Sequence, residues 1–346
     1  RELWRSDGTT SGTYALTDTN NGSVNIFSPV EANGSIYFVA SQSTILQEIW
    51  KSNGTTQYGA SAVTSINSES NNSVRSNNLL SLYDSFLYFS AVTVAVDGEQ
   101  LWGLNCADDS YNSIYNYYDS SADIQELIAF GSNVIFTAQS SFNDLEVWKY
   151  DTSVTSTSNL SDINTSGSSN PIGYTEAGGI LYFIANDGAI STGFELYAVD
   201  SSNSGVYLVK DINPGTADAF INMIGAFNND LIFSASDGTN GQELWRSDGS
   251  DAGTVMIKDI NSGAGGSWAN TGKSAELNGS LFFFANDGIN GTQLWRTDGS
   301  DSGTMMISNV SGGVCTTCDL AAFDDKIFFT GWESSTGDEI WVFAIK

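Results

Sequence analysis

The chain has 346 residues, of which 40% are hydrophobic and 12% aromatic, so it is long enough to bury a large core. It carries 40 Asp and Glu against 12 Lys and Arg, a net charge of −28, which argues against nucleic acid or an anionic membrane surface as a partner. It contains no His, which excludes Ser-His-Asp and Cys-His catalysis and His-ligated zinc.

The chain opens, without a Met, inside a motif that recurs to its end, so we expect a trimmed N-terminus. The motif is an acid or amide, an aliphatic residue and an aromatic one, and successive aromatics are 46, 52, 46, 49, 48, 50 and 46 residues apart. This spacing predicts a repeat architecture with a unit of roughly 48 residues. The aromatic residues of the eight copies are Trp4, Trp50, Trp102, Trp148, Tyr197, Trp245, Trp295 and Trp341.

A second apolar motif, such as IYFVA at 36–40, precedes most of these copies by about ten residues and occurs seven times. Each copy follows a pair of turn-forming residues, such as Asn33-Gly34 or Asn278-Gly279, that suits a tight hairpin. A weakly apolar stretch before the turn and another after the aromatic motif complete the unit. Each repeat is therefore predicted to be four antiparallel strands, with helices nearly absent.

Four antiparallel strands in each repeat predict an all-β fold, a β-propeller of four-stranded blades, and a single domain over residues 1–346. Seven blades are expected if residues 1–18 supply the last two strands of a blade that begins at 317–331. That arrangement leaves the final strand, 339–346, without a place, and eight blades are the alternative. The aromatic residues of the third strands are expected to form the core between neighbouring blades.

The segments ELWRSDG (243–249) and QLWRTDG (293–299), each followed by Gly-Thr, resemble the ELWxxDGT-repeat proteins of bacteria. Residues 2–13 match the same pattern almost completely, and its spacing covers the whole chain. The resemblance implies a secreted or cell-surface protein. It supplies no catalytic residue.

Asp-Gly pairs recur in two turns of the repeat, after the second strand and after the third. Those after the second strand begin at Asp187, Asp237 and Asp287, and their oxygens could bind calcium. The Asp-x-Asp-x-Asp-Gly spacing of a calcium loop is absent. We therefore favour Asp as a cap of its own turn, with Gly at positive φ, and keep calcium as the alternative. No other cofactor is expected.

Two aromatics interrupt the repeat pattern, Phe220 and Trp268, in the long connections 211–220 and 259–268. We interpret them as candidate binding residues on one loop face, with burial between blades as the alternative. Glu176 and Glu276 recur near the ends of first strands and are candidate binding residues of a channel. A pair of carboxylates could hydrolyse a glycoside, but equivalent positions in a repeat argue for a structural role.

Cys315 and Cys318 form a CxxC that is expected to be a disulfide, because an extracellular compartment permits one, with two inert thiols as the alternative. Cys106 is expected to be buried. Taken together, the sequence predicts a non-catalytic extracellular or cell-surface propeller. It would bind a protein or glycan, or serve as a scaffold component of a surface assembly, without nucleic acid and without membrane insertion. The alternative is a carbohydrate-active enzyme.

Overall fold

The computed structural model describes residues 2–17, 25–42, 45–66, 74, 80–92, 99–115, 124–141, 144–188, 193–200, 205–267, 274–310, 313–314, 320–333 and 337–344. Every regular element in these ranges is a β-strand, which confirms the all-β prediction. No helix long and apolar enough to cross a membrane occurs in the same ranges. The chain divides into two compact units, residues 1–160 and 161–346.

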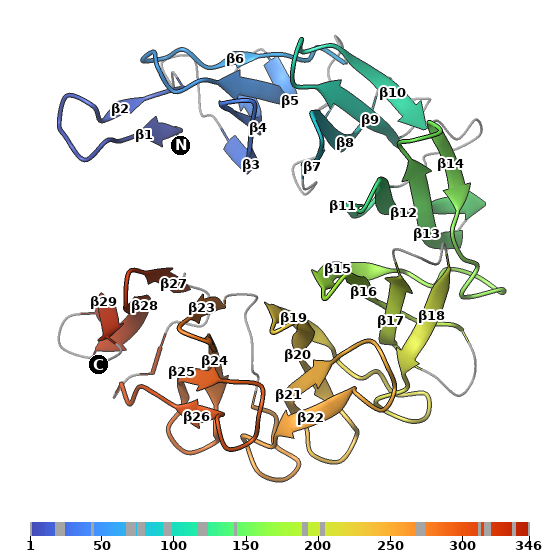
Figure 1. Ribbon diagram of the computed structural model, residues 1–346, viewed down its shortest axis with the longest axis vertical. Helices are drawn as coiled ribbons and strands as arrows, with labels where there is room; N and C mark the ends of the chain where they lie inside the picture. The colour runs from blue at the N-terminus through green and yellow to red at the C-terminus, as the bar shows by residue number, and fades with distance from the viewer. Residues whose placement is uncertain are drawn as a thin grey trace. The chain divides into compact units, whose positions relative to one another are not determined.

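The first unit holds a two-stranded sheet followed by three four-stranded antiparallel sheets (Figure 1). Within each four-stranded sheet the strands lie side by side in chain order, which is the meander predicted for a blade. The strands are β1 (Trp4–Arg5), β2 (Tyr14–Ala15), β3 (Asn25–Ala32), β4 (Ser35–Gln42), β5 (Ile45–Ser52), β6 (Ser61–Ala62), β7 (Ser81–Tyr83), β8 (Phe86–Val92), β9 (Glu99–Asn105), β10 (Tyr111–Tyr115), β11 (Leu127–Phe130), β12 (Asn133–Ser141), β13 (Asp144–Asp151) and β14 (Ser156–Asn159).

The second unit holds three further four-stranded sheets and one sheet of three strands. In both units neighbouring sheets contact each other through their first strands, as in β15 with β19 and β7 with β11. The strands are β15 (Ile172–Ala177), β16 (Ile180–Ala185), β17 (Glu195–Asp200), β18 (Val206–Lys210), β19 (Asn222–Phe227), β20 (Asp230–Ser236), β21 (Gln242–Ser247), β22 (Val255–Lys258), β23 (Ala275–Leu277), β24 (Ser280–Asn286), β25 (Thr292–Thr297), β26 (Met305–Met306), β27 (Leu320–Phe323), β28 (Lys326–Glu333) and β29 (Gly337–Ala344).

The described strands form eight sheets, a count that fits the alternative of eight blades. The final strand, which had no place in the seven-blade scheme, is β29, and it pairs with β28 as the third strand of the last sheet. The N-terminal strands β1 and β2 pair with each other as a separate two-stranded sheet. A single domain, and a blade shared by the two ends of the chain, stay predictions.

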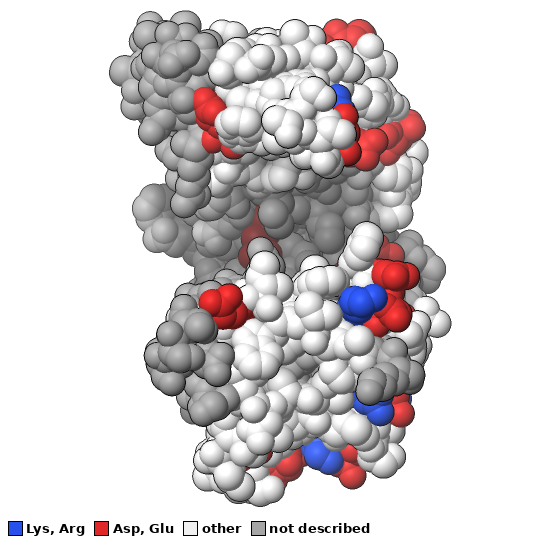
Figure 2. All heavy atoms as spheres, turned by 90° about the vertical axis from the view of Figure 1, so that its left-hand side faces the viewer, with Lys and Arg blue, Asp and Glu red and all other residues white. Residues whose placement is uncertain are grey.

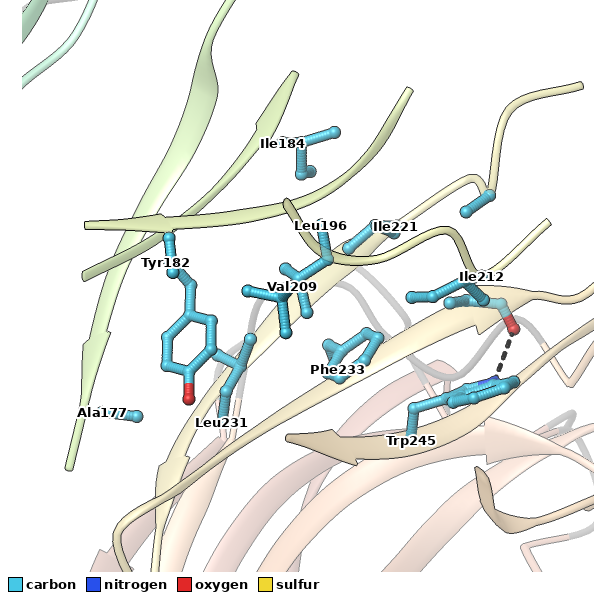
Figure 3. Packing of buried hydrophobic residues seen from close by; sticks show 13 residues of the cluster. Ala177, Tyr182, Ile184, Leu196, Val209, Ile212, Ile221, Leu231, Phe233 and Trp245 are labelled. Carbon is cyan, nitrogen blue, oxygen red and sulfur yellow. Dashed lines mark hydrogen bonds between the residues drawn. The ribbon is translucent and has the colours of Figure 1, made fainter. Parts of the chain in front are cut away.

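The core lies between neighbouring sheets. The second strand of each blade is apolar on both faces because both are covered. Around the sheet β19–β22, Phe233 and Trp245 pack with Tyr182 and Leu196 of the preceding sheet (Figure 3). The Trp245 indole N–H donates to the Ala235 carbonyl at 3.0 Å, so the polar edge of the ring is satisfied inside the core.

The third-strand aromatics are buried or half-buried in seven of the eight copies, as predicted. Trp4 differs, with 58% of its surface exposed. Among the described residues its sheet consists of β1 and β2 alone, without the first and second strands that cover the equivalent ring in other blades. For Trp4 the predicted burial is therefore wrong.

The turn after the third strand explains the Asp-Gly-Ser/Thr part of the repeat. The Asp248 carboxylate accepts hydrogen bonds from the Ser250 hydroxyl at 2.6 Å and the Ser250 backbone N–H at 2.9 Å. These bonds lower the pKa of Asp248. The Ser250 hydroxyl oxygen accepts from the Gly253 N–H at 2.9 Å, and the Thr254 hydroxyl donates to the Ser250 carbonyl at 2.7 Å. A Cβ at Gly253 would lie 2.0 Å from the Asp248 carboxylate, so this glycine cannot be replaced cheaply.

Candidate functional site

Buried glutamates hold the long connections that lead from one blade to the next. Glu243 in β21 is fully buried, and its carboxylate accepts N–H bonds from Ile260 at 2.7 Å and Ser267 at 3.0 Å. Glu195 in β17 accepts from Ile212 at 2.7 Å in the same way. The acidic residue that opens the third-strand motif therefore holds the connection that follows its blade. Glu243 fixes both ends of the connection 259–267, and Glu195 fixes the start of the connection 211–220.

The environment of these two glutamates changes their acidity. Burial raises the pKa of Glu195 to about 7, against the opposing effect of the N–H groups of Ile212 and Asn213. Burial likewise raises the pKa of Glu243 to about 7, against the donors from Ile260, Ser267 and Asn261. Both groups therefore change charge near neutral pH rather than in acid.

An asparagine bridges each connection from inside. The Asn213 side-chain amide donates to the Asp218 carbonyl at 2.9 Å, and Asn261 donates to the Gly266 carbonyl at 3.0 Å. The turn after the second strand packs directly on these amides. A Cβ at Gly238 would lie 2.5 Å from the Asn213 amide oxygen, so Gly238 is required for close approach as well as for its φ of 79°. This end of the blades is consequently a fixed surface.

Phe220 lies on this end of the blades, in the connection 211–220. It has 64% of its surface exposed and a φ of 48°, a left-handed conformation that a bulky side chain rarely adopts. The residues on either side, Ala219 and Ile221, are buried. Ala219 donates its N–H to the Phe194 carbonyl at 3.1 Å and accepts from the Ser236 N–H at 2.7 Å. The exposed-aromatic interpretation of Phe220 therefore agrees with the structure, and burial between blades does not.

The two recurring glutamates of first strands are exposed. Glu176 in β15 pairs opposite Leu181, and Glu276 in β23 pairs opposite Leu281. These are the same register positions of two blades, which is the symmetry that the repeat predicts. Each side chain faces solvent, and neither carboxylate lies in a buried, polarised environment of the kind that Glu243 has.

The Asp-Gly turns at Asp237 and Asp287, which follow second strands, are capped by their own aspartates. Asp237 accepts on one carboxylate oxygen from the N–H groups of Thr239 and Asn240, and on the other from the Asn240 side chain at 2.8 Å. Burial acts to raise the pKa of Asp237, but these donors outweigh it and lower the pKa. Asp287 makes the same bonds to Ile289 and Asn290. Gly188, Gly238 and Gly288, which follow Asp187, Asp237 and Asp287, all have positive φ, as expected.

A different group of acids could converge on a cation. The carboxylates of Asp144, Glu146 and Asp162 include oxygens within 4.8 Å of one another among the described residues. Oxygen donors of this kind suit calcium or magnesium. None of the three calcium candidates from the Asp-Gly turns belongs to this group.

We expect Asp237→Ala to lower the free energy of unfolding by about 1–2 kcal/mol through the loss of the turn cap. The loss should be the same in excess calcium and in EDTA, because both carboxylate oxygens of Asp237 already accept protein hydrogen bonds. Thermal melts of the two proteins under the two conditions measure it. A loss that is much larger in calcium than in EDTA would assign a bound ion to this turn.

Three residues singled out in the sequence, Trp268, Cys315 and Cys318, lie outside the described residues, and the disulfide stays a prediction. Trp268 directly follows Ser267, which occupies the position of Ala219 in its own connection: Ser236 bonds back to Ala219, and Asn286 bonds back to Ser267. Cys106 is buried as a free thiol, as expected.

The sequence interpretation missed the structural importance of the glutamates that open the third-strand motif and of the asparagines in the connections. A signal was present. An acid inside an otherwise apolar strand must find buried partners, and Asp-Ile-Asn recurs at 162–164, 211–213 and 259–261, at the start of three connections.

No protein-family model matches the chain, and no curated protein sequence matches it either. Solved structures do. A prolyl endopeptidase structure is 11% identical and matches 93% of this chain with a TM-score of 0.57, and a puromycin hydrolase structure is 11% identical and matches 94% with a TM-score of 0.53. A computationally designed protein, Ika8, is 13% identical and matches 95% of this chain and 87% of its own, with a TM-score of 0.51.

The chain spans about half the length of the two peptidase structures, 48% and 52% respectively. Their similar parts are propeller domains. At this level of identity the likeness concerns the fold alone. Together with the repeated four-stranded sheets, it defines the chain as a β-propeller protein.

Proposed function

We propose that this chain is a non-catalytic, extracellular or cell-surface propeller that binds a partner through the loop end of its blades that carries Phe220. The single observation behind the proposal is the exposed Phe220 side chain on a connection held by buried hydrogen bonds. Exposed aromatics on rigid supports carry a large share of binding energy in protein interfaces.

The backbone conformation of Phe220 supports a role beyond the fold. In the equivalent position of the preceding connection, the left-handed residue is Asn170, with the same φ of 48°. Asn adopts this conformation readily, whereas Phe does so at a cost of order 1–3 kcal/mol. An exposed side chain regains none of this cost by packing in the free protein. A strained, exposed aromatic is the pattern expected of a contact residue.

The charge of the chain indicates the kind of partner. Acidic side chains are distributed over the face shown in Figure 2, where the few visible basic groups lie beside acids. A protein that presents basic groups around an apolar patch would complement a chain with a net charge of −28, and its association would weaken with salt. A glycan is the second candidate, since aromatic rings also stack on sugars. The resemblance to ELWxxDGT-repeat proteins supports an extracellular location.

A non-catalytic role is supported by how the carboxylates are used. Asp237 and Asp248 cap turns, Glu195 and Glu243 anchor connections, and the exposed glutamates of the first strands occupy equivalent positions. An active site requires residues that break the symmetry of a repeat. The alternative is a carbohydrate-active enzyme that uses carboxylates of the channel, for which Glu176 and Glu276 are the candidates.

We expect Phe220→Ala to weaken partner capture by about tenfold or more, which corresponds to the 2 kcal/mol or so of an interface hot spot. The melting temperature should stay unchanged or rise, because an exposed, strained side chain is removed. Capture from the native cell surface, followed by titration of the partner, measures the effect. The double change Phe220→Ala with Trp268→Ala should weaken capture further.

Phe323→Ala is the matched control, because Phe323 is equally exposed but lies in the hairpin at the opposite end of its blade. It should leave capture unchanged. A large drop in melting temperature for Phe220→Ala would show a packing role. Turnover on a glycan panel that is abolished by Glu176→Gln or Glu276→Gln would place the chain among the enzymes.

A further inference from the structure

Two neighbouring blade junctions of the first unit differ at one position. In the sheet β3–β6, the second-strand residue Tyr37 pairs opposite Lys51 of the third strand. In the sheet β7–β10, the equivalent Tyr88 pairs opposite Gly103. Third strands elsewhere commonly carry a basic residue here, such as Arg246. At Gly103 the sheet β7–β10 therefore lacks the cationic side chain that the repeat usually has at this position.

The first junction shows what that cation does. The Lys51 ammonium lies over the Tyr37 ring, 5.1 Å from its centroid, and donates to the Asp109 carboxylate at 2.9 Å. Asp109 belongs to the next sheet, in the turn between β9 and β10. The Tyr37 hydroxyl donates to the same carboxylate at 3.0 Å. The lysine thus combines a cation–π contact with an ion pair and fills the space between two blades.

At the second junction, between the sheets β7–β10 and β11–β14, that space is an open pocket of about 290 Å³. Asp109 is replaced as well, because the equivalent turn residue before Ser156 is Thr155, and both have positive φ. A different carboxylate, Asp84 in the hairpin turn between β7 and β8, lines the pocket instead. The side chains around it that carry the argument are Tyr83, Asp84, Phe86, Tyr88, Asn112 and Tyr150.

The Tyr88 hydroxyl has no hydrogen bond within the described part of the chain, although the residue as a whole is only 4% exposed. Its equivalents do have partners: Tyr37 bonds to Asp109, and Tyr182 donates to the Ser247 carbonyl of the next sheet. Burial also raises the pKa of Tyr88 to about 12. A hydroxyl that lines a pocket without a partner is free to form a hydrogen bond with a ligand.

The pocket is rich in acceptors: its tyrosine hydroxyls can accept as well as donate, and other donors are already used. The Thr152 hydroxyl already donates to the Ser132 carbonyl at 2.8 Å, and the Asn112 amide nitrogen donates to the Ser113 carbonyl at 3.1 Å. The Asp84 carboxylate accepts only. None of the described residues that line the pocket is Lys or Arg. Acceptors, ring faces and one negative charge complement a donor-rich cation, and an ammonium has three donors and no acceptor.

We propose that the pocket between the sheets β7–β10 and β11–β14 binds a primary ammonium group on an aliphatic stem, in the place that Lys51 takes at the preceding junction. The ammonium lies against the Tyr88 ring and pairs with Asp84, while the stem packs on Phe86 and Tyr150. A lysine side chain of a partner protein and a free alkyl amine share this chemistry. The site is independent of Phe220, at the hairpin end of the blades rather than the connection end.

The test is a titration of the full chain with n-butylammonium chloride, followed by calorimetry and tyrosine fluorescence. We expect saturable binding that n-butanol does not reproduce. Asp84→Asn should weaken it about fivefold, since a partly exposed ion pair contributes up to about 1 kcal/mol. Asn tolerates the φ of 56° at this position. Asp324→Asn makes the same charge change at the equivalent hairpin turn of the last sheet and should leave binding within about twofold.

Gly103→Lys should abolish binding by supplying the missing cation internally. A Cβ there would meet only the end of the Ile114 side chain, 2.9 Å away, so a small shift admits it. Should this variant not fold, as judged by circular dichroism, Tyr88→Phe provides the second measurement, with an expected loss of about threefold. Tighter binding of a lysine-containing tripeptide than of n-butylammonium would identify a protein partner as the source, and equal binding a free amine.

Three results would overturn the proposal: equal binding of n-butanol, binding of methyl glucoside in place of the amine, or no effect of Asp84→Asn and Tyr88→Phe on n-butylammonium binding. Phe220→Ala should not alter this titration. Failure of the ammonium site and failure of the proposed partner surface are therefore separate observations.

Discussion

Trp295→Ala is expected to lower the free energy of unfolding by about 3–5 kcal/mol, the usual range for emptying a buried aromatic position. Trp295 lies in β25 and is 6% exposed. It packs with Leu281 and Phe283 of its own sheet and with Ile224 and Phe227 of the preceding one. The substitution therefore opens a cavity at a junction of two blades, where neither sheet can collapse without moving the other.

Trp4→Ala is the matched control. Trp4 occupies the same motif position but is largely exposed, so its removal should change stability by less than about 1 kcal/mol. Denaturant titrations of the two variants and the parent protein provide the comparison. Equal losses for the two variants would mean that exposure does not separate these positions, and a loss below about 1 kcal/mol for Trp295→Ala would refute its place in the core.

The strands could be predicted from the sequence because each motif reflects a local requirement, either burial of an apolar strand or the backbone conformation of a turn. An aliphatic-aromatic-Phe segment can be covered on both faces only between sheets, and Tyr182 and Phe233 lie there. Asp-Gly pairs predict turns because Asp caps its own backbone and Gly accepts positive φ, and Asp237-Gly238 does both. Periodicity then gives the architecture. The count of blades is harder, since it depends on which strands at the ends of the chain pair with which.

The features that the sequence did not predict depend on contacts between repeats. Trp4 has the same motif as the other copies, but in the described residues it belongs to a sheet of two strands rather than four. Gly103 is one glycine among 35, and it becomes informative only when the register places it opposite Tyr88. Similarly, the sequence shows Glu243 only as part of a repeated motif. Its structural role depends on the three backbone N–H groups that donate to its carboxylate.

The buried glutamates lead to an expectation about pH. The pKa of Glu195 and of Glu243 is about 7 in the folded chain, against an ordinary value of 4.5. A raised pKa means that the folded state binds more protons than the unfolded state between these values. The stability that each group contributes is therefore complete below about pH 4.5 and is lost as the pH rises through 7. The capped aspartates, such as Asp248, have lowered pKa values and act only in acid.

We therefore expect the free energy of unfolding to fall between pH 5 and pH 8, by an amount on the order of 3 kcal/mol for each of the two glutamates. Denaturant titrations at a series of pH values and constant ionic strength measure it. Glu243→Gln should remove the contribution of Glu243 from the slope of the profile, and the fold should tolerate the change because Gln293 already holds this position in the next blade without a charge. The reciprocal change, Gln293→Glu, should steepen it. The Gln293 side chain donates to the carbonyl oxygens of Asn290 and Val310, so an ionised carboxylate there would face two acceptors.

General charge repulsion in this acidic chain also reduces stability at high pH. It is nearly the same in the parent protein and the two variants, so the differences between their slopes isolate the buried groups. Parallel profiles for the parent protein and Glu243→Gln would show that Glu243 titrates at the same pH in the folded and unfolded chains.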